Sequence, residues 1–244
     1  MSDAVLEIEH LRFAWPPGRQ PCLDIAGFIV RRGEAVFVHG PSGCGKSTLL
    51  SLMAGVLLPQ AGRVKLLGTD WHALRPSARD RFRVDHVGYI FQQFNLLPYL
   101  SVLDNVLLPC RFSARRREQT ARHADSSRAA GSSRPAAEAW LHGMGLGAEL
   151  WHRPATALSV GQQQRVAAAR ALIGQPELII ADEPTSALDE ARRDAFLDRL
   201  LSACRAASSA LVLVSHDHRI ASRFDRQILL PSINRAAQPD ATTA

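Results

Sequence analysis

Short runs of apolar residues recur along the chain without polar alternation, and stretches with helical periodicity lie between them. The runs cover residues 35–38, 87–91, 178–181 and 210–214. A strand that is apolar on both faces is typical of a mainly parallel sheet covered by helices on its two sides. Helical patterns that alternate with such runs therefore predict an α/β fold.

The strand-like runs gather towards the two ends of the chain. We expect a core made of segments 1–91 and 159–232, with a strand-poor helical subdomain, 92–158, between them. Residues 121–135 are rich in Ser, Ala, Arg and Gly, which offer little surface to bury, so this stretch predicts a mobile surface loop. The tail, 233–244, is expected to fray.

The composition is that of a globular chain. Of the 244 residues, 46% are hydrophobic and 21% are charged, which excludes a largely disordered protein. The four cysteines lie at least 22 residues apart, which fits free thiols rather than a zinc site or a small disulfide scaffold. No apolar run reaches the roughly 18 residues of a membrane span, and the acidic start lacks a signal core. We expect any membrane role to come through a partner.

The net charge of +6 and the high isoelectric point raise the possibility of a nucleic-acid partner. Seven arginines and two acids fall between Arg111 and Arg134, so this stretch holds five of the six net charges. No aromatic-interleaved basic stripe or zinc-finger spacing accompanies them, and no nucleic-acid partner is expected. Two interpretations of the run stay open: a solvated helix face with a loop, or contact with anionic headgroups or an acidic partner.

A phosphate-binding loop follows the first of the buried strand runs. Residues 40–48 read GPSGCGKST, which is the G-x-x-x-x-G-K-S pattern. Gly43 and Gly45 allow the tight turn that aims backbone N–H groups at phosphate oxygens. Lys46 supplies charge to the β- and γ-phosphates, and Ser47 can ligate Mg²⁺. A helix begins here, and its buried face is predicted to use Leu49, Leu50, Leu52, Met53 and Val56.

Two acids, Asp182 and Glu183, follow the strand run 178–181 directly. At the end of a buried strand, the first acid can hold Mg²⁺. The second can reach an attacking water as a general base or an orienting group. Such a pair alone is weak evidence, because acids also cap loops, but together with a phosphate loop it indicates a nucleotide-hydrolysing site.

Further motifs make the chain resemble the ATP-binding subunit of an ABC transporter. Residues 158–165, LSVGQQQR, resemble the signature that is usually written LSGGQ, and residues 182–189, DEPTSALD, resemble the Walker B and D-loop run. Residues 214–217, VSHD, resemble the switch-histidine region, and residues 91–92 resemble the Q-loop. Five motifs in this order are far more specific than a phosphate loop alone.

The resemblance implies a P-loop NTPase core with an inserted helical subdomain and an antiparallel β region near the N-terminus. It implies ATP and Mg²⁺ as ligands and hydrolysis of ATP to ADP and phosphate. Two copies would bind head to tail, most simply as a homodimer, and drive a separate integral-membrane permease docked near residues 92–99. The chain would then lie in the cytoplasm, peripheral on the inner face of the cell membrane.

The resemblance also assigns roles to residues. Those implied in catalysis are Lys46, Glu183 and His216, and those implied in Mg²⁺ binding are Ser47, Gln92 and Asp182. Those implied in ATP binding are Trp15, Gly40, Pro41, Ser42, Gly43, Cys44, Gly45, Lys46, Ser47, Thr48, Ser159, Gly161, Gln162 and Asp189. Trp15 would stack on adenine, with a partly buried strand-end aromatic as the alternative. Gln93 would replace Gln92 if the register shifts by one. A metal pair at His216 and His218 is a weaker alternative to the switch role.

The chain departs from the family pattern at Val160, where the consensus has Gly, and the β-branched side chain restricts the backbone there. The Ser/Arg-rich stretch resembles an insertion. The runs 92–98 and 162–165 resemble most the branch of lipoprotein-release, macrolide-export and cell-division ATPases. Three alternatives to a transport motor are open: a mechanotransmission complex without transport, a soluble ATPase acting on nucleic acid, and a regulatory cassette without turnover.

Overall fold

The computed structural model describes residues 3–16, 20–122, 132–186 and 188–237. Most of the predicted mobile loop, 123–131, and the last part of the predicted frayed tail, 238–244, lie outside the described residues. The described ends of that loop are helical, since one helix ends at Arg122 and the next begins at Arg134.

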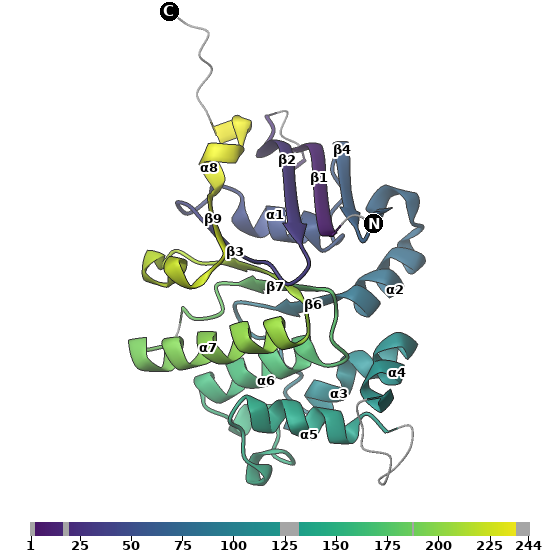
Figure 1. Cartoon of the computed structure of the whole chain (residues 1–244), viewed down its shortest axis with the longest axis vertical. Helices are drawn as coiled ribbons and strands as arrows, with labels where there is room; N and C mark the ends of the chain where they lie inside the picture. The colour runs from purple at the N-terminus through teal and green to yellow at the C-terminus, as the bar shows by residue number, and fades with distance from the viewer. Residues whose placement is uncertain (1–2, 17–19, 123–131, 187, 238–244) are drawn as a thin grey trace, which may run out of the picture.

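A parallel sheet runs through the middle of the described chain (Figure 1). Its strands in spatial order are β6 (Val87–Ile90), β7 (Leu178–Asp182), β8 (Ala210–Val214), β3 (Ala35–His39) and β9 (Arg226–Leu229). Successive side chains of a strand point to opposite faces. In β3, Ala35 and Phe37 enter one hydrophobic core, whereas Val36 and Val38 enter another. Burial on both faces explains why the strand runs are apolar without alternation.

An antiparallel sheet packs over one side of this layer. Its strands in spatial order are β2 (Leu23–Arg31), β1 (Ala4–Phe13), β4 (Ala61–Leu66) and β5 (Thr69–Asp70). One hydrophobic core joins this sheet, the first helix and the near face of the parallel sheet. The predicted α/β fold with an antiparallel region near the N-terminus is confirmed.

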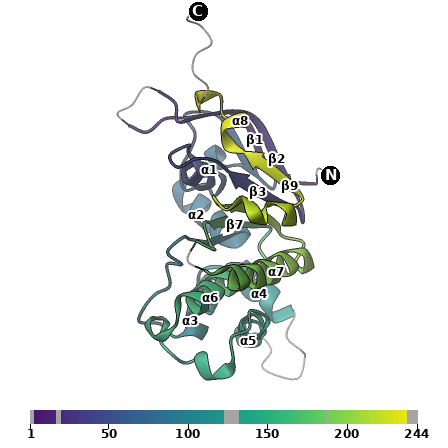
Figure 2. The same cartoon turned by 90° about the vertical axis from the view of Figure 1, so that its left-hand side faces the viewer.

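Most helices lie on the side of the parallel sheet that faces away from the antiparallel sheet, whereas α1 packs between the two sheets (Figure 2). The helices are α1 (Lys46–Met53), α2 (Pro76–His86), α3 (Val102–Phe112), α4 (Ala114–Arg122), α5 (Arg134–Gly143), α6 (Val160–Leu172), α7 (Glu190–Ala206) and α8 (Leu230–Ile233). The second core lies between the far face of the parallel sheet and α3, α5, α6 and α7. In the described part of the chain, no helix is both long and apolar enough to cross a membrane.

Helix α1 is shorter than its apolar pattern predicts. Leu49, Leu50, Leu52 and Met53 are fully buried, but Val56 lies beyond the helix and is 56% exposed, so its predicted place in the buried face is wrong. Gly55 follows the helix with φ +66°, and a Cβ there would lie 2.5 Å from the Trp71 ring. The chain therefore turns away against Trp71 before Val56 can reach the core.

One member of the arginine run is buried, which neither interpretation of that run predicts. Arg116 on α4 is 1% exposed and donates to four backbone carbonyl groups. The acceptors are the carbonyl oxygens of Val84, Val87, Ala171 and Ile173, at 2.7 to 3.3 Å. Burial lowers the pKa of Arg116 to about 10. This arginine fastens α4 to the ends of α2 and α6.

The start of the tail is anchored rather than frayed. Asn234 is buried, and its Oδ1 accepts a hydrogen bond from the N–H of Asp24 at 2.8 Å. Its Nδ2 donates to the carbonyl oxygen of Cys22 at 3.0 Å. These bonds tie the residues just after α8 to the beginning of β2, two elements far apart in the sequence.

Candidate active site

The phosphate loop joins β3 to α1 as the sequence predicts. Gly43 and Gly45 have φ values of +80° and +99°, and a Cβ at Gly45 would also lie 2.9 Å from the Leu23 side chain. Such positive values favour glycine. The loop curls around Lys46, whose Nζ donates to the carbonyl oxygens of Gly40 and Pro41 at 2.9 Å each. No side chain caps α1, so its first turn can offer N–H groups to an anion.

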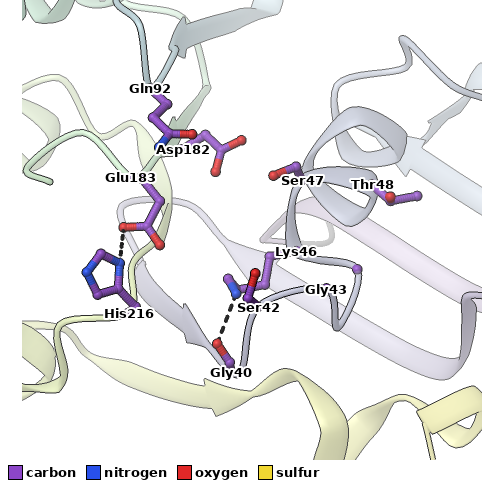
Figure 3. A pocket seen from close by; sticks show the side chains of 11 residues that line it. Gly40, Ser42, Gly43, Lys46, Ser47, Thr48, Gln92, Asp182, Glu183 and His216 are labelled. Carbon is purple, nitrogen blue, oxygen red and sulfur yellow. Dashed lines mark hydrogen bonds and ion pairs between the residues drawn. The ribbon is translucent and has the colours of Figure 1, made fainter.

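A cavity of about 460 Å³ opens above this loop. The residues that line it are Gly40, Ser42, Gly43, Gly45, Lys46, Ser47, Thr48, Gln92, Asp182, Glu183 and His216. Figure 3 shows Gln92 and the two acids on one wall, facing Lys46 and Ser47 on the other. The strand ends of β6, β7 and β8 bring this wall together, because parallel strands place their carboxyl ends at one edge. Gln92 lines the cavity and Gln93 does not.

The environment of Asp182 fits a divalent cation. Burial raises the pKa of Asp182, and the charge of Glu183 adds to this, while a hydrogen bond with Ser47 and the charge of Lys46 act the other way. Carboxylate, hydroxyl and amide oxygens of Asp182, Ser47 and Gln92 all border the cavity. These hard oxygen donors suit Mg²⁺, and a cation would offset the buried acidic charge.

Glu183 and His216 form a pair on the same wall. The Nδ1 atom of His216 lies 2.9 Å from Oε2 of Glu183, and the histidine side chain is 71% exposed. Glu183 has φ +46°, a sparsely populated value for a residue with a side chain. Ser186 holds the strained turn by donating from Oγ to the Glu183 carbonyl oxygen at 3.1 Å. The geometry suits a carboxylate that is aimed at a water molecule and steadied by an imidazole.

A charged latch, Arg193 with Asp217, holds the segment that carries His216. Arg193 on α7 is buried, and its Nη1 donates to Oδ2 of Asp217 at 2.6 Å. Asp217 also accepts from the backbone N–H and Nε of Arg219. Hydrogen bonds from Arg219 and the charge of Arg193 lower the pKa of Asp217 to about 2. Arg193 also pairs with its sequence neighbours Glu190 and Asp194, but nothing in the local sequence marks its contact with Asp217, which is 24 positions away.

Trp15 lies beside the cavity but is not among its lining residues. The indole is 52% exposed and meets the Phe13 ring edge-on at 5.2 Å. Its Nε1 donates to Oγ1 of Thr48 at 3.3 Å. Pro41 and Cys44 belong to the phosphate loop without bordering the cavity.

The signature residues lie apart from this cavity. Ser159 and Gln162 form a reciprocal capping box at the start of α6, and Asp189 caps α7 by accepting from the N–H of Arg192. A Cβ at Gly161 would lie 3.5 Å from Leu188, so the two helix starts are neighbours. None of the signature residues lines the cavity that holds Lys46.

Val160 is compatible with this geometry. It is the first residue of α6, is 48% exposed, and is not among the described residues with positive φ. A helical backbone is open to valine. The departure from the family consensus at this position therefore leaves the capping box intact.

Comparisons with known proteins agree with this architecture. The family model described as "ABC transporter" matches residues 23–186. The "Uncharacterized ABC transporter ATP-binding protein YbbA" of Escherichia coli (strain K12) is 39% identical over 242 residues, covering 98% of this chain and 99% of its own. The "Lipoprotein-releasing system ATP-binding protein LolD" of Hydrogenovibrio crunogenus is 37% identical, covering 94% and 95%.

A solved structure is also similar. It is the dimeric structure of a post-hydrolysis state of the ATP-binding cassette MJ0796 bound to ADP and Pi, with a TM-score of 0.80 and 30% identity over 96% of each chain. The overall fold is thus shared with an ATP-binding cassette. The chain belongs to the ABC transporter family and is an ABC-type ATPase of the P-loop NTPase fold, an ATP-binding subunit.

Proposed function

We propose that the chain hydrolyses ATP as a dimer in which each cavity is completed by the signature residues of a second copy. The observation that carries this proposal is the separation of the two halves. Lys46, Asp182 and Glu183 meet at one cavity, whereas Ser159 and Gly161 both lie at the start of α6, outside it. The dimeric state of the cassette MJ0796 supports the same arrangement.

Each residue of the cavity then has a distinct task. Lys46 and the N–H groups of the loop bind the β- and γ-phosphates. Ser47, Gln92 and Asp182 hold Mg²⁺, which neutralises phosphate charge when it is bound. Glu183 orients the attacking water and accepts its proton. His216 keeps the Glu183 carboxylate in place and contacts the γ-phosphate. Trp15, half exposed beside Thr48, stacks on adenine.

We propose that a membrane permease binds next to the segment that carries Gln92. A groove of about 240 Å³ there is lined mainly by apolar side chains, among them Phe91, Leu108 and Phe112. Phe112 is 70% exposed and Tyr99 is 77% exposed. Exposed aromatic side chains of this size are typical of protein interfaces. The dimer thereby lies at the inner face of the cell membrane, and the similarity to LolD favours the lipoprotein-release branch.

Glu183→Gln tests the shared site. The variant keeps the shape of the side chain and loses the base, so phosphate release should fall by about 10²–10⁴-fold. ATP should then persist in the interface, and size-exclusion chromatography with ATP and Mg²⁺ should show a dimer. Lys46→Ala is the matched control and should remain monomeric. A Glu183→Gln protein that elutes only as a monomer with ATP would refute the proposal.

A further inference from the structure

A third buried arginine, Arg170, lies near the end of α6. It is 8% exposed, and in the part of the chain that the structure describes its guanidinium bonds backbone carbonyl groups rather than an acidic side chain. Its Nη1 donates to the carbonyl oxygen of Asn95 at 2.7 Å, and its Nη2 donates to that of Phe94 at 2.5 Å. Burial lowers the pKa of Arg170 to about 10, so the group is charged at neutral pH. Both terminal nitrogens of the guanidinium thus donate to carbonyl groups of the same turn, residues 91–95.

The turn that Arg170 holds is strained. Phe94 and Asn95 have φ values of +59° and +48°, although neither is glycine. Backbone of this kind persists only where its surroundings hold it. The Phe94 side chain is buried in the core, and the N–H of Phe94 donates to the carbonyl oxygen of Phe91 at 2.9 Å. Gln92, which reaches into the nucleotide cavity, lies inside this turn.

The same helix carries the signature residues at its other end. Ser159 caps α6, and Arg170 lies about 16 Å further along the axis at the rise of an α-helix. The helix is uninterrupted from Val160 to Leu172 and packs against α3 and β6. A displacement of the signature end of α6 would therefore also displace Arg170 and the two carbonyl groups that it binds.

We propose that Arg170 is a positioning residue that fixes Gln92 in the nucleotide cavity by fastening the 91–95 turn to α6. The signature helix and the Mg²⁺-facing side of the cavity then move together. Arg170 also lines the groove next to Phe91, so a permease segment bound in the groove would contact Arg170 and the turn that it holds. The inference rests on the role of Gln92 in the proposed function.

The test is a double-mutant cycle between Arg170→Lys and Gln92→Ala, measured as steady-state phosphate release. Lysine keeps the charge, but its single ammonium lacks the planar fork that places a separate nitrogen on each carbonyl group. We expect Arg170→Lys to lower kcat about tenfold, with the KM for ATP unchanged, because the phosphate loop is untouched. In the Gln92→Ala background, the same change should lower kcat by less than about twofold.

Arg116→Lys is the matched control. Arg116 is an equally buried arginine bound to carbonyl groups, but none of them belongs to the 91–95 turn. It should lower the melting temperature and leave kcat unchanged below that temperature, alone or with Gln92→Ala. If Arg170→Lys behaves like Arg116→Lys, the inference is overturned and Arg170 is merely structural.

Asn95→Pro disrupts the contact between Arg170 and the 91–95 turn by changing the turn instead of the arginine. It replaces Arg170→Lys as the test if that variant does not fold. Proline cannot adopt φ +48°, so the turn should be lost while α6 is unchanged. The same loss of kcat is expected, and an unchanged kcat overturns the inference. If Gln92→Ala alone leaves kcat unchanged, the role of Gln92 in the proposed function fails together with the inference. If the losses in kcat from Arg170→Lys and Gln92→Ala are additive in the double variant, only the inference is overturned.

Discussion

The two walls of the nucleotide cavity are built in different ways. The phosphate-loop wall comes from consecutive residues, and its anchor, Lys46 bound to two loop carbonyl groups, lies within six positions of its acceptors. The opposite wall brings together Gln92, Asp182, Glu183 and His216 from three strand ends. Its supports come from other elements, since the latch of Arg193 and Asp217 spans 24 positions. Changes in the first wall should alter nucleotide affinity, and changes behind the second should alter turnover.

The largest effect on ATP affinity is expected at the phosphate-loop wall. Lys46→Ala removes the charge that faces the β- and γ-phosphates, so ATP affinity should fall on the order of 100-fold. Isothermal titration calorimetry with and without Mg²⁺ measures it. Unchanged ATP affinity would contradict the assignment of the loop.

A smaller effect is expected behind the opposite wall. Arg193→Met releases Asp217 from α7, and the His216 segment should loosen. We expect kcat to fall about tenfold, equivalent to roughly 1.4 kcal/mol of transition-state stabilisation, with ATP affinity unchanged. Arg205→Gln is the control, because it changes an exposed arginine on the same helix. If Arg193→Met lowers ATP affinity as much as it lowers kcat, the two walls do not differ in controlling affinity and turnover.

The same latch gives a pH dependence of stability. The pKa of Asp217 is lowered from 3.8 to about 2, so its contribution to the free energy of unfolding is full above the ordinary value and is lost as pH falls through the lowered one. The stability difference between the wild type and Asp217→Asn should be constant from pH 8 to about pH 5 and shrink between about pH 4 and pH 2. Denaturant titrations at these pH values check it. If the stability difference between the wild type and Asp217→Asn already shrinks at neutral pH, the pH dependence comes from a group other than Asp217.

The smallest effect is expected at the signature. Val160→Gly restores the family consensus but puts glycine into the first turn of α6, which costs up to about 1 kcal/mol. We expect the melting temperature to fall by about 2–4 °C and kcat to stay the same. A several-fold rise in kcat would show that Val160 holds the signature in a less active conformation.

The contrast between the walls also explains what the sequence could predict. The phosphate loop and the acids at the end of β7 depend on neighbours in the chain, so their local structure follows from a few residues. The apolar runs predicted the parallel strands, because burial on both faces leaves no alternation. The order of the strands and the layers that cover them are not local properties, and the pattern alone left them open.

The failures have long-range causes. Val56 continues the apolar pattern of α1, but Trp71 ends the helix from 15 positions further along the chain. Arg116 belongs to a run of arginines, and its burial depends on carbonyl groups of α2, β6 and the end of α6. Arg170 and Arg193 act on segments distant in the sequence. Composition treats such residues as surface charge, because arginine is mostly exposed in proteins.

The anchored asparagine after α8 has a practical meaning for protein engineering. Trimming the chain back to Ser232 would remove Asn234 and leave the N–H of Asp24 and the carbonyl group of Cys22 without their partners at the edge of a sheet. Unpaired strand edges invite aggregation. Affinity tags and fluorescent fusions are therefore better joined beyond residue 237, where they leave the hydrogen bonds of Asn234 to Asp24 and Cys22 in place.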